Sequence, residues 1–250
     1  MRQDYEAFIF DLDGTLAVSK SPISLEVSNF LSSLLQKNKT VGIISGGKMS
    51  QFEQQFLANF SADPTLYQKL YLMPTCGAAM YRWASAAWQE QYAYRISESE
   101  YKRICDAFDA TFLQTSFPRP TPQWGEQIEH RDTQITFSAF GQSAPPSEKA
   151  KWDAANTKKQ EIVGIISPLL PEYSVKAGGM TSVDITHKEI DKKFGIEQFL
   201  AATGHRVTDT LFVGDALYEG GNDYAATKTG VDICQVEGPD DLLVKLANFV

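Results

Sequence analysis

The sequence predicts an α/β fold: a core built on a parallel sheet, interrupted by an inserted α+β domain. Near both ends of the chain, short apolar runs alternate with helical patterns, which is typical of βαβ units. In the middle of the chain, polar and apolar residues partly alternate, which is typical of antiparallel strands. We therefore expect a discontinuous core at residues 1–80 and 187–250 and an insert at residues 81–186.

The first half of the chain predicts three strands and two helices. Residues 6–12 form an apolar run expected to be a strand, and "SLEVSNFLSSLLQ" follows with apolar residues close to helical spacing. The pattern then repeats, because "TVGIISGG" is a β-branched run ending in glycines and "MSQFEQQFLANF" places its aromatic residues on one helical stripe. A third strand is expected in "KLYLMPTCG".

The insert and the second half of the core follow. In the insert we expect antiparallel strands at "AMYRW", "WQEQYAY", "EQIEHRD" and "TQITFSAF", with helices near 97–114 and 146–169. The proline-rich stretch "RPTPQWGE" predicts a loop. After "TSVDIT" the core resumes with "KKFGIEQFLAAT" as a helix, "TLFVGDAL" as a strand, "NDYAATKTG" as a helix, "VDICQV" as a strand and "DDLLVKLANF" as a helix.

Composition excludes several classes of function. The 250 residues carry a formal net charge of -8 and a sequence pI of about 5.0, which disfavours binding to nucleic acid or to an anionic membrane. The start of the chain has acids before a short apolar run and predicts neither a signal peptide nor a membrane span, so we expect a cytoplasmic protein. The three scattered cysteines predict neither a disulfide framework nor a zinc site.

Two acids, Asp11 and Asp13, end the first predicted strand in "AFIFDLDGTLAV". Side chains two positions apart in a strand share one side, and open α/β sheets bind ligands at the carboxyl edge of their strands. Two carboxylates ~4 Å apart at an effective dielectric near 20 repel each other by roughly 4 kcal/mol. A cation is therefore expected between them, with the Thr15 hydroxyl close by.

A second acidic turn, "FVGDALYEGGND", ends another apolar strand and supplies Asp215, Asn222 and Asp223. If the two strands are neighbours in a parallel sheet, three or four carboxylates converge. Hard oxygen ligands of this kind suit Mg²⁺. A magnesium ion there would also hold phosphate oxygens and leave one aspartate free to attack phosphorus.

These residues resemble a known family. "DLDGT", "IISGG", the lysine of "EIDKKFG" and "GDALYEGGND" resemble, in order, the four motifs of the haloacid-dehalogenase-like (HAD) phosphotransferases. The insert after the third strand resembles the subclass with an α/β cap, which contains Cof-type sugar phosphatases and eukaryotic-type phosphomannomutases. "GEQIEHRDTQITFSAFGQ" and "GGMTSVDITHKEIDK" also resemble the mutase cap. The resemblance implies a Rossmann-like HAD core and a cap that recognises the substrate.

The resemblance implies catalytic roles for four residues. Asp11 would be the nucleophile that forms an aspartyl phosphate, and Asp13 would be the general acid and base. Ser45 would donate a hydrogen bond to the transferring phosphoryl group. Lys192 would neutralise charge on that group and on Asp11. Helix phase alone does not distinguish Lys192 from Lys193, and the resemblance favours Lys192.

The resemblance also implies a metal site and a phosphate site. Magnesium would be held by Asp11, the main-chain carbonyl of Asp13, Asp215 and Asp223. The phosphate is expected to contact Thr15, Gly46 and Asn222.

Substrate recognition is expected in the insert. Ser182 and Asp184 share one face of a predicted strand and Arg131 lies on another, and in phosphomannomutases the corresponding residues contact the sugar phosphate. Gly178 and Gly179 would let the backbone approach the ligand.

The chain departs from the mutase cap at one position. The mutase cap carries a Gly-Arg pair whose arginine grips the distal phosphate, whereas this chain has Gly141 and Gln142, with Lys149 and Lys151 nearby as possible substitutes. We therefore expect a Mg²⁺-dependent sugar-phosphate phosphatase first, a phosphomannomutase that interconverts hexose 1-phosphate and 6-phosphate second, and a non-catalytic sugar-phosphate binder third. The expected partner is a small phosphorylated sugar, bound by a monomer or a homodimer.

Overall fold

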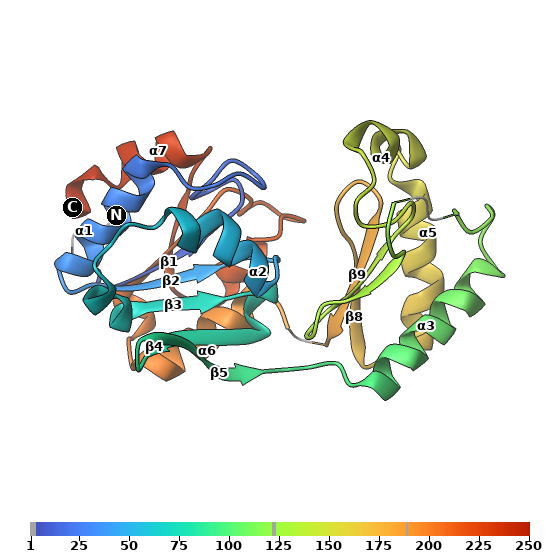
Figure 1. The fold of residues 1–250 in the computed structure, drawn as a ribbon, viewed down its shortest axis with the longest axis horizontal. Coiled ribbons are helices and arrows are strands. Elements are labelled where there is room, and N and C mark those ends of the chain that lie inside the picture. The colour runs from blue at the N-terminus through green and yellow to red at the C-terminus, as the bar shows by residue number, and fades with distance from the viewer. Residues whose placement is uncertain (1–3, 122–123, 189) are drawn as a thin grey trace. The chain divides into compact units, whose positions relative to one another are not determined.

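A computed structural model of the chain describes residues 4–121, 124–188 and 190–250. These residues fall into two units, one formed by Met1–Ala93 with Ile190–Val250 and the other by Tyr94–Glu189 (Figure 1). The chain thus leaves the first unit once and returns to it once. None of the helices formed by the described residues combines the length and apolar character needed to span a bilayer.

The first unit contains a seven-stranded sheet in the order β11-β10-β1-β2-β3-β4-β5. The five strands from β11 to β3 run parallel, as the alternation of strands and helices predicts, and β4 and β5 are antiparallel. The strands are β1 (Ala7–Asp11), β2 (Thr40–Ile44), β3 (Leu70–Met73), β4 (Ala79–Ala84), β5 (Ala87–Ala93), β10 (Thr210–Gly214) and β11 (Asp232–Gln235).

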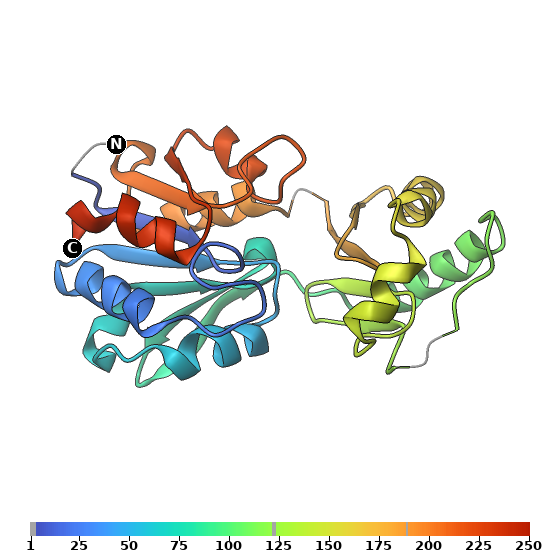
Figure 2. The ribbon, with the colours of Figure 1, turned by 90° about the horizontal axis from the view of Figure 1, so that it is seen from above.

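Helices cover both faces of this sheet, as Figure 1 and Figure 2 show. Alternate residues of β1 point to opposite faces: Phe8 and Phe10 pack in the same cluster as α1 and α7, whereas Ala7 and Ile9 pack with α6. Because both faces are buried, the strand is apolar from Ala7 to Phe10 rather than alternating, and only its last residue, Asp11, is polar. The helices are α1 (Leu25–Gln36), α6 (Lys192–Thr203) and α7 (Pro239–Lys245), and a short α2 (Met49–Gln51) follows β2.

The strands at residues 79–93 belong to the core sheet, which differs from the expected start of the insert at residue 81. β4 pairs with the core strand β3 through Leu72 and Tyr81, and β5 pairs with β4. A hairpin at the edge of a sheet exposes one of its faces, so its sequence alternates like that of the insert, and sequence pattern alone did not separate the two. The second unit begins instead at Tyr94.

The second unit contains a four-stranded antiparallel sheet in the order β6-β7-β9-β8, with helices against one face. Ile135 and Phe137 of β7 pack in one cluster with Phe108 of α3 and Ile162 of α5. The opposite face of β7 and β9 therefore presents the intervening polar residues. The elements are α3 (Glu98–Phe112), β6 (Ile128–His130), β7 (Ile135–Ser138), α4 (Pro146–Trp152), α5 (Thr157–Ile166), β8 (Tyr173–Ala177) and β9 (Ser182–His187).

Three expected helices differ from the structure, and strand β8 has no counterpart among the predicted elements. The helix expected at 146–169 is divided into α4 and α5, because the carboxylate of Asp153 accepts hydrogen bonds from the main-chain N–H groups of Thr157, Lys158 and Lys159 and starts a new helix. The helix expected after β2 is present but irregular: α2 continues into a π-helical turn at Phe52–Phe56 and a 3-10 turn at Leu57–Asn59. The one expected at 222–230 is only a 3-10 helix at Tyr224–Lys228. Residues 122–123 of the expected loop lie outside the described residues.

Candidate active site

The candidate active site of the first unit lies at the carboxyl edge of the parallel sheet. β1 lies between β10 and β2, and its last residue, Asp11, is in register with Ile44 at the end of β2. Asp215 follows directly after β10. The two acidic turns predicted from the sequence are therefore brought together by the pairing of β1 with β10, which is the condition on which the metal hypothesis depended.

Lys192 lies between two buried carboxylates. It is the first residue of α6, whose N-cap Asp191 accepts a hydrogen bond from the main chain of Phe194. The fully buried ammonium donates to Oδ1 of Asp11 and to Oδ1 of Asp223. Lys193, the alternative left open by helix phase, faces Glu197 on the exposed side of the helix.

The charges in this cluster shift one another's protonation. The pKa of Asp11 is raised to about 7. Burial and the nearby charge of Asp223 raise it, and together they outweigh the Lys192 ammonium, which lowers it. Burial alone would lower the pKa of Lys192, but the carboxylates of Asp11 and Asp223 outweigh it and raise that pKa. Burial and the charge of Asp223 also raise the pKa of Asp215. The site thus holds more negative charge than one lysine balances.

Three acids of this site are arranged as a metal ion requires. One carboxylate oxygen each from Asp11, Asp215 and Asp223 lie within 4.8 Å of one another. Oδ2 of Asp11 is buried and has no hydrogen-bond partner among the described residues, which is costly unless a cation or a ligand meets it. A set of carboxylate oxygens matches the preference of Mg²⁺. These residues therefore fit a magnesium ion.

The side chain of Asp13 has hydrogen-bond partners outside the three clustered acids. Its Oδ2 accepts a hydrogen bond of 2.7 Å from Nε2 of Gln51, and its Oδ1 accepts from the main chain of Lys20 at 2.7 Å and from Gln55 at 3.3 Å. The metal role expected for Asp13 falls on its main-chain carbonyl, so this placement does not conflict with it. Sequence reasoning missed Gln51 and Gln55, because these amides belong to no recognised motif. Their only signal is that they lie four residues apart, on one side of a helical turn, shortly after the glycines at 46 and 47.

Other predicted residues of the first unit lie around the same edge. Thr15 is fully buried, with its hydroxyl 3.5 Å from Oδ1 of Asp215. Ser45 is buried after β2, and its hydroxyl accepts a hydrogen bond from the main chain of Gly47. Gly46 follows it in the same turn. Asn222 is exposed beside the buried Asp223.

Gly14 is required by the local geometry at this edge. Its φ is +89°, and a Cβ atom there would lie 2.5 Å from Oδ2 of Asp215. Any side chain at this position would therefore displace a candidate metal ligand.

In the second unit, four predicted residues meet at the start of β9, next to the turn that joins it to β8. Asp184 accepts a hydrogen bond of 2.8 Å from Thr136, its partner across β7, and burial raises the pKa of this carboxyl. A Cβ atom on Gly178 would lie 2.5 Å from the Asp184 carboxylate and 2.7 Å from the Ser182 hydroxyl. Gly179 comes next in the same turn. The turn between β8 and β9 is thus pressed against both polar side chains.

Arg131 is positioned by Gln142, the residue that departs from the mutase pattern. The guanidinium of Arg131 donates to Glu129 at 2.5 Å and to Oε1 of Gln142 at 3.0 Å. The side-chain amide of Gln142 donates in turn to the main-chain carbonyl of Thr136, and Nζ of Lys149 donates to the main-chain carbonyl of Gln142. Gln142 therefore links the candidate arginine to the sheet. Lys151, the other possible substitute, pairs with Glu148.

The fold of this chain is similar to that of several solved structures. The chain aligns with an N-terminally truncated IMP-nucleotidase of Plasmodium falciparum at a TM-score of 0.72 and 14% identity, covering 98% of this chain and 70% of that one. It aligns with a trehalose-6-phosphate phosphatase of Aspergillus fumigatus at a TM-score of 0.60 and 17% identity, covering 98% and 92%. At these identities the likeness shows the fold alone, an α/β fold of the HAD-like class.

The family within this class follows from sequence. Residues 27–250 match the model of the eukaryotic phosphomannomutase family. A phosphomannomutase of Encephalitozoon cuniculi is 25% identical over 98% of this chain and 93% of its own, and human phosphomannomutase 1 is 22% identical over 89% and 83%. The chain belongs to the eukaryotic phosphomannomutase family. This favours mutase transfer over the hydrolysis that we placed first from the motifs.

Proposed function

We propose that the protein is a magnesium-dependent phosphomannomutase that interconverts the 1-phosphate and 6-phosphate of a hexose. The observation that carries the proposal is the buried Asp11–Lys192–Asp223 cluster at the sheet edge, in a chain whose relatives are phosphomannomutases. Two carboxylates around one buried ammonium cost the folded protein free energy, and Oδ2 of Asp11 finds no hydrogen-bond partner among the described residues. Such a cost is typical of a functional site, here one that binds a cation and a phosphoryl group.

In this mechanism, Asp11 is the nucleophile. A carboxylate oxygen of Asp11 attacks phosphorus, the bond from phosphorus to the sugar oxygen breaks, and that oxygen takes a proton from Asp13. In the return step, Asp13 accepts the proton of a sugar hydroxyl, which attacks the aspartyl phosphate and restores Asp11. Lys192 compensates the charge that builds up on the phosphoryl oxygens.

Magnesium would be held by Asp11, Asp215, Asp223 and the carbonyl of Asp13. When bound, the ion supplies positive charge that screens the acids from the incoming phosphate. Ser45, Thr15, Gly46 and Asn222 are proposed to hold the phosphate around it.

We assign substrate recognition to the insert as a cap. Arg131, Ser182 and Asp184 offer a guanidinium, a hydroxyl and a carboxylate to the phosphate and the hydroxyls of the sugar. Gly178 and Gly179 leave room for a ligand at the same turn. The cap then selects the substrate, while the core, which includes the hairpin of β4 and β5, performs the transfer.

A second candidate function is simple hydrolysis of a sugar phosphate. It is favoured by Gln142, because an amide that accepts from Arg131 does not supply the charge that an arginine at this position gives to a second phosphate. A mutase handles a bisphosphate intermediate and needs that second site, whereas a phosphatase does not.

The proposal is tested by incubating the purified protein with mannose 1-phosphate and Mg²⁺, with and without a hexose bisphosphate activator. We expect mannose 6-phosphate, formed faster with the activator. Release of inorganic phosphate without any isomer would replace the mutase with the phosphatase. Binding of the sugar phosphate with neither product would leave a non-catalytic sugar-phosphate binder.

A further inference from the structure

We infer that Lys159 is a positioning residue for substrate binding, acting through the turn between β8 and β9. This inference rests on the proposed function, because it concerns the site that the cap offers to the sugar phosphate. Lys159 carries no motif, and its side chain belongs to none of the candidate sites described above.

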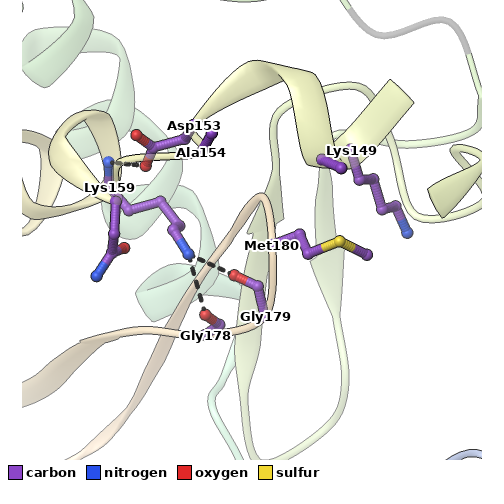
Figure 3. A pocket seen from close by; sticks show the side chains of 9 residues that line it. Lys149, Asp153, Ala154, Lys159, Gly178, Gly179 and Met180 are labelled. Atoms are coloured by element: carbon purple, nitrogen blue, oxygen red, sulfur yellow. Dashed lines mark hydrogen bonds between the residues drawn. The ribbon is translucent and has the colours of Figure 1, made fainter. Parts of the chain in front are cut away.

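Lys159 is a buried lysine whose ammonium contacts main-chain oxygens. It lies in the first turn of α5 and is 6% exposed. Its Nζ donates to the carbonyl of Gly179 at 2.6 Å and to that of Gly178 at 3.4 Å (Figure 3). Burying an ammonium is costly, and an apolar side chain of similar volume would serve packing alone at least as well. The contact with the turn is therefore the feature that needs an ammonium at this place.

The main chain of Lys159 is held by hydrogen bonds to Asp153. The carboxylate of Asp153 accepts hydrogen bonds from the main-chain N–H groups of three successive residues, including Lys159 at 2.9 Å. These hydrogen bonds fix the first turn of α5, and from there the Lys159 side chain reaches the turn between β8 and β9.

The turn that Lys159 holds is the one that touches the candidate substrate residues. Gly178 donates its N–H to the carbonyl of Ser182 at 2.8 Å, and its Cα stands directly against the side chains of Ser182 and Asp184. A shift of the turn would therefore move or release these two side chains. The chain of contact runs from α5 through Lys159 and the glycines to the polar face of β9.

A cavity of about 420 Å³ adjoins this contact. It is lined by residues of α4, of the start of α5 and of the turn, among them Lys149, Lys159 and Met180 (Figure 3). Asp153, Gly178 and Gly179 line the same cavity, so the position of the turn helps to set its shape. A displacement of the turn would therefore change how a ligand binds in this cavity.

The test compares Lys159→Met and Lys159→Arg with the wild type, with Lys102→Met, an exposed lysine of α3, as the matched control. Initial rates with mannose 1-phosphate give KM and kcat. Hydrogen exchange of the peptide spanning residues 177–184 reports on the turn without requiring activity.

For Lys159→Met we expect KM to rise about tenfold with kcat within about threefold of wild type, because binding and not chemistry loses its support. Exchange in the turn should quicken while α3 stays as in the wild type. Lys159→Arg should recover most of the affinity, and Lys102→Met should match the wild type. An unchanged KM, a loss confined to kcat, or unchanged exchange in the turn would overturn the inference. If the wild type lacks activity on mannose 1-phosphate, the proposed function fails and the exchange result alone decides the role of Lys159.

Discussion

At the scale of single residues, three buried charged side chains lie together at the edge of the core sheet. Asp11, Lys192 and Asp223 are all buried, and burial raises the pKa of Asp11 to about 7 in spite of the neighbouring ammonium. The three groups compensate one another only partly, because two carboxylates share one lysine. Such an arrangement is typical of sites where a further cation or an anionic substrate completes the balance.

The lysines at positions 192 and 193 should differ in their contribution to stability. We expect Lys192→Met to lower the free energy of unfolding by about 3–5 kcal/mol, because it leaves two buried carboxylates without their partner. Lys193→Met removes the same charge from the exposed face of α6 and should stay near the wild-type value. Urea unfolding of both variants without added metal measures the difference. Equal stabilities would show that Lys192 does not hold the cluster together.

Removing the metal should stop turnover. We expect an excess of chelator to abolish activity and added Mg²⁺ to restore it. Asp215→Asn should raise the Mg²⁺ concentration for half-maximal activity by about tenfold or more, since one of three clustered carboxylates loses its charge. Asp209→Asn, an exposed acid paired with Arg206, is the control and should leave the requirement unchanged. Full activity in excess chelator would contradict the metal proposal.

The residues found from the sequence were those with a positional signal. Asp11 and Asp215 end apolar strands, and the parallel pairing of those strands brought the two residues together as expected. Gln51 and Lys159 were missed because each acts through side-chain hydrogen bonds made by the tertiary fold, and nothing in the surrounding sequence marks them. Lys192 was separated from Lys193 by the structure, since helix phase depends on where the helix begins.

At the scale of elements, α6 is placed by a close approach between two glycines. A Cβ atom on Gly77, in the turn after β3, would lie 2.3 Å from the Cα of Gly195 in α6. This contact sets how near the helix, and with it Lys192, comes to the sheet edge. The glycines are needed because any side chain at residue 77 would push the helix outward.

A pair of glycine substitutions tests this contact. Gly77→Ala should lower the free energy of unfolding by about 2 kcal/mol or more, because it combines a positive φ with a steric clash, and it should also reduce activity. Gly164→Ala should instead stabilise the protein by about 0.5–1 kcal/mol, since this glycine lies inside α5 with open space around its Cα. Thermal or chemical unfolding measures both. A harmless Gly77→Ala would remove this explanation for the position of α6.

The start of α3 predicts a pH dependence of stability. Ser97 and Glu100 form a capping box, and the hydrogen bonds from the hydroxyl and main-chain N–H of Ser97 lower the pKa of Glu100 to about 2. The folded state therefore favours the charged form. Its contribution is fully present above the ordinary pKa of 4.5 and is lost as the pH falls from there towards about 2.

Glu100→Gln should accordingly be less stable than the wild type at neutral pH, and the difference should shrink as the pH falls below about 4.5. Glu98→Gln, in the same turn but outside the capping box, is the control. Urea unfolding at several pH values provides the measurement. A difference that stays constant across this range would show that the capping box does not depend on the charge of Glu100.

The elements themselves were predictable where the period of the pattern was unambiguous. α1 and α6 were predicted with their bounds nearly correct from the spacing of apolar residues and the alternation of strands and helices, and in the structure Ser24 and Asp191 cap them. The hairpin of β4 and β5 was assigned to the wrong sheet, since an edge hairpin has the same alternation in either sheet. The break between α4 and α5 depends on the side chain of Asp153, which a search for apolar periodicity does not see.

At the scale of the whole molecule, the candidate residues are divided between two units. The charged cluster around Asp11 belongs to the first unit, and Arg131 and Asp184 belong to the second. With a formal net charge of -8, the protein as a whole repels an anionic substrate, so capture must depend on local cations such as Lys192 and Arg131. We therefore assign transfer to the first unit and selection to the second.

The most direct test of this account is to identify the residue that carries the phosphoryl group during turnover. The protein is mixed with a hexose bisphosphate and Mg²⁺, quenched rapidly in acid and analysed by peptide mass spectrometry, with Asp11→Asn as the control. The account predicts one phosphoryl group on Asp11 in the wild type and none in the variant. A phosphoryl group on another residue, or turnover retained by Asp11→Asn, would contradict it.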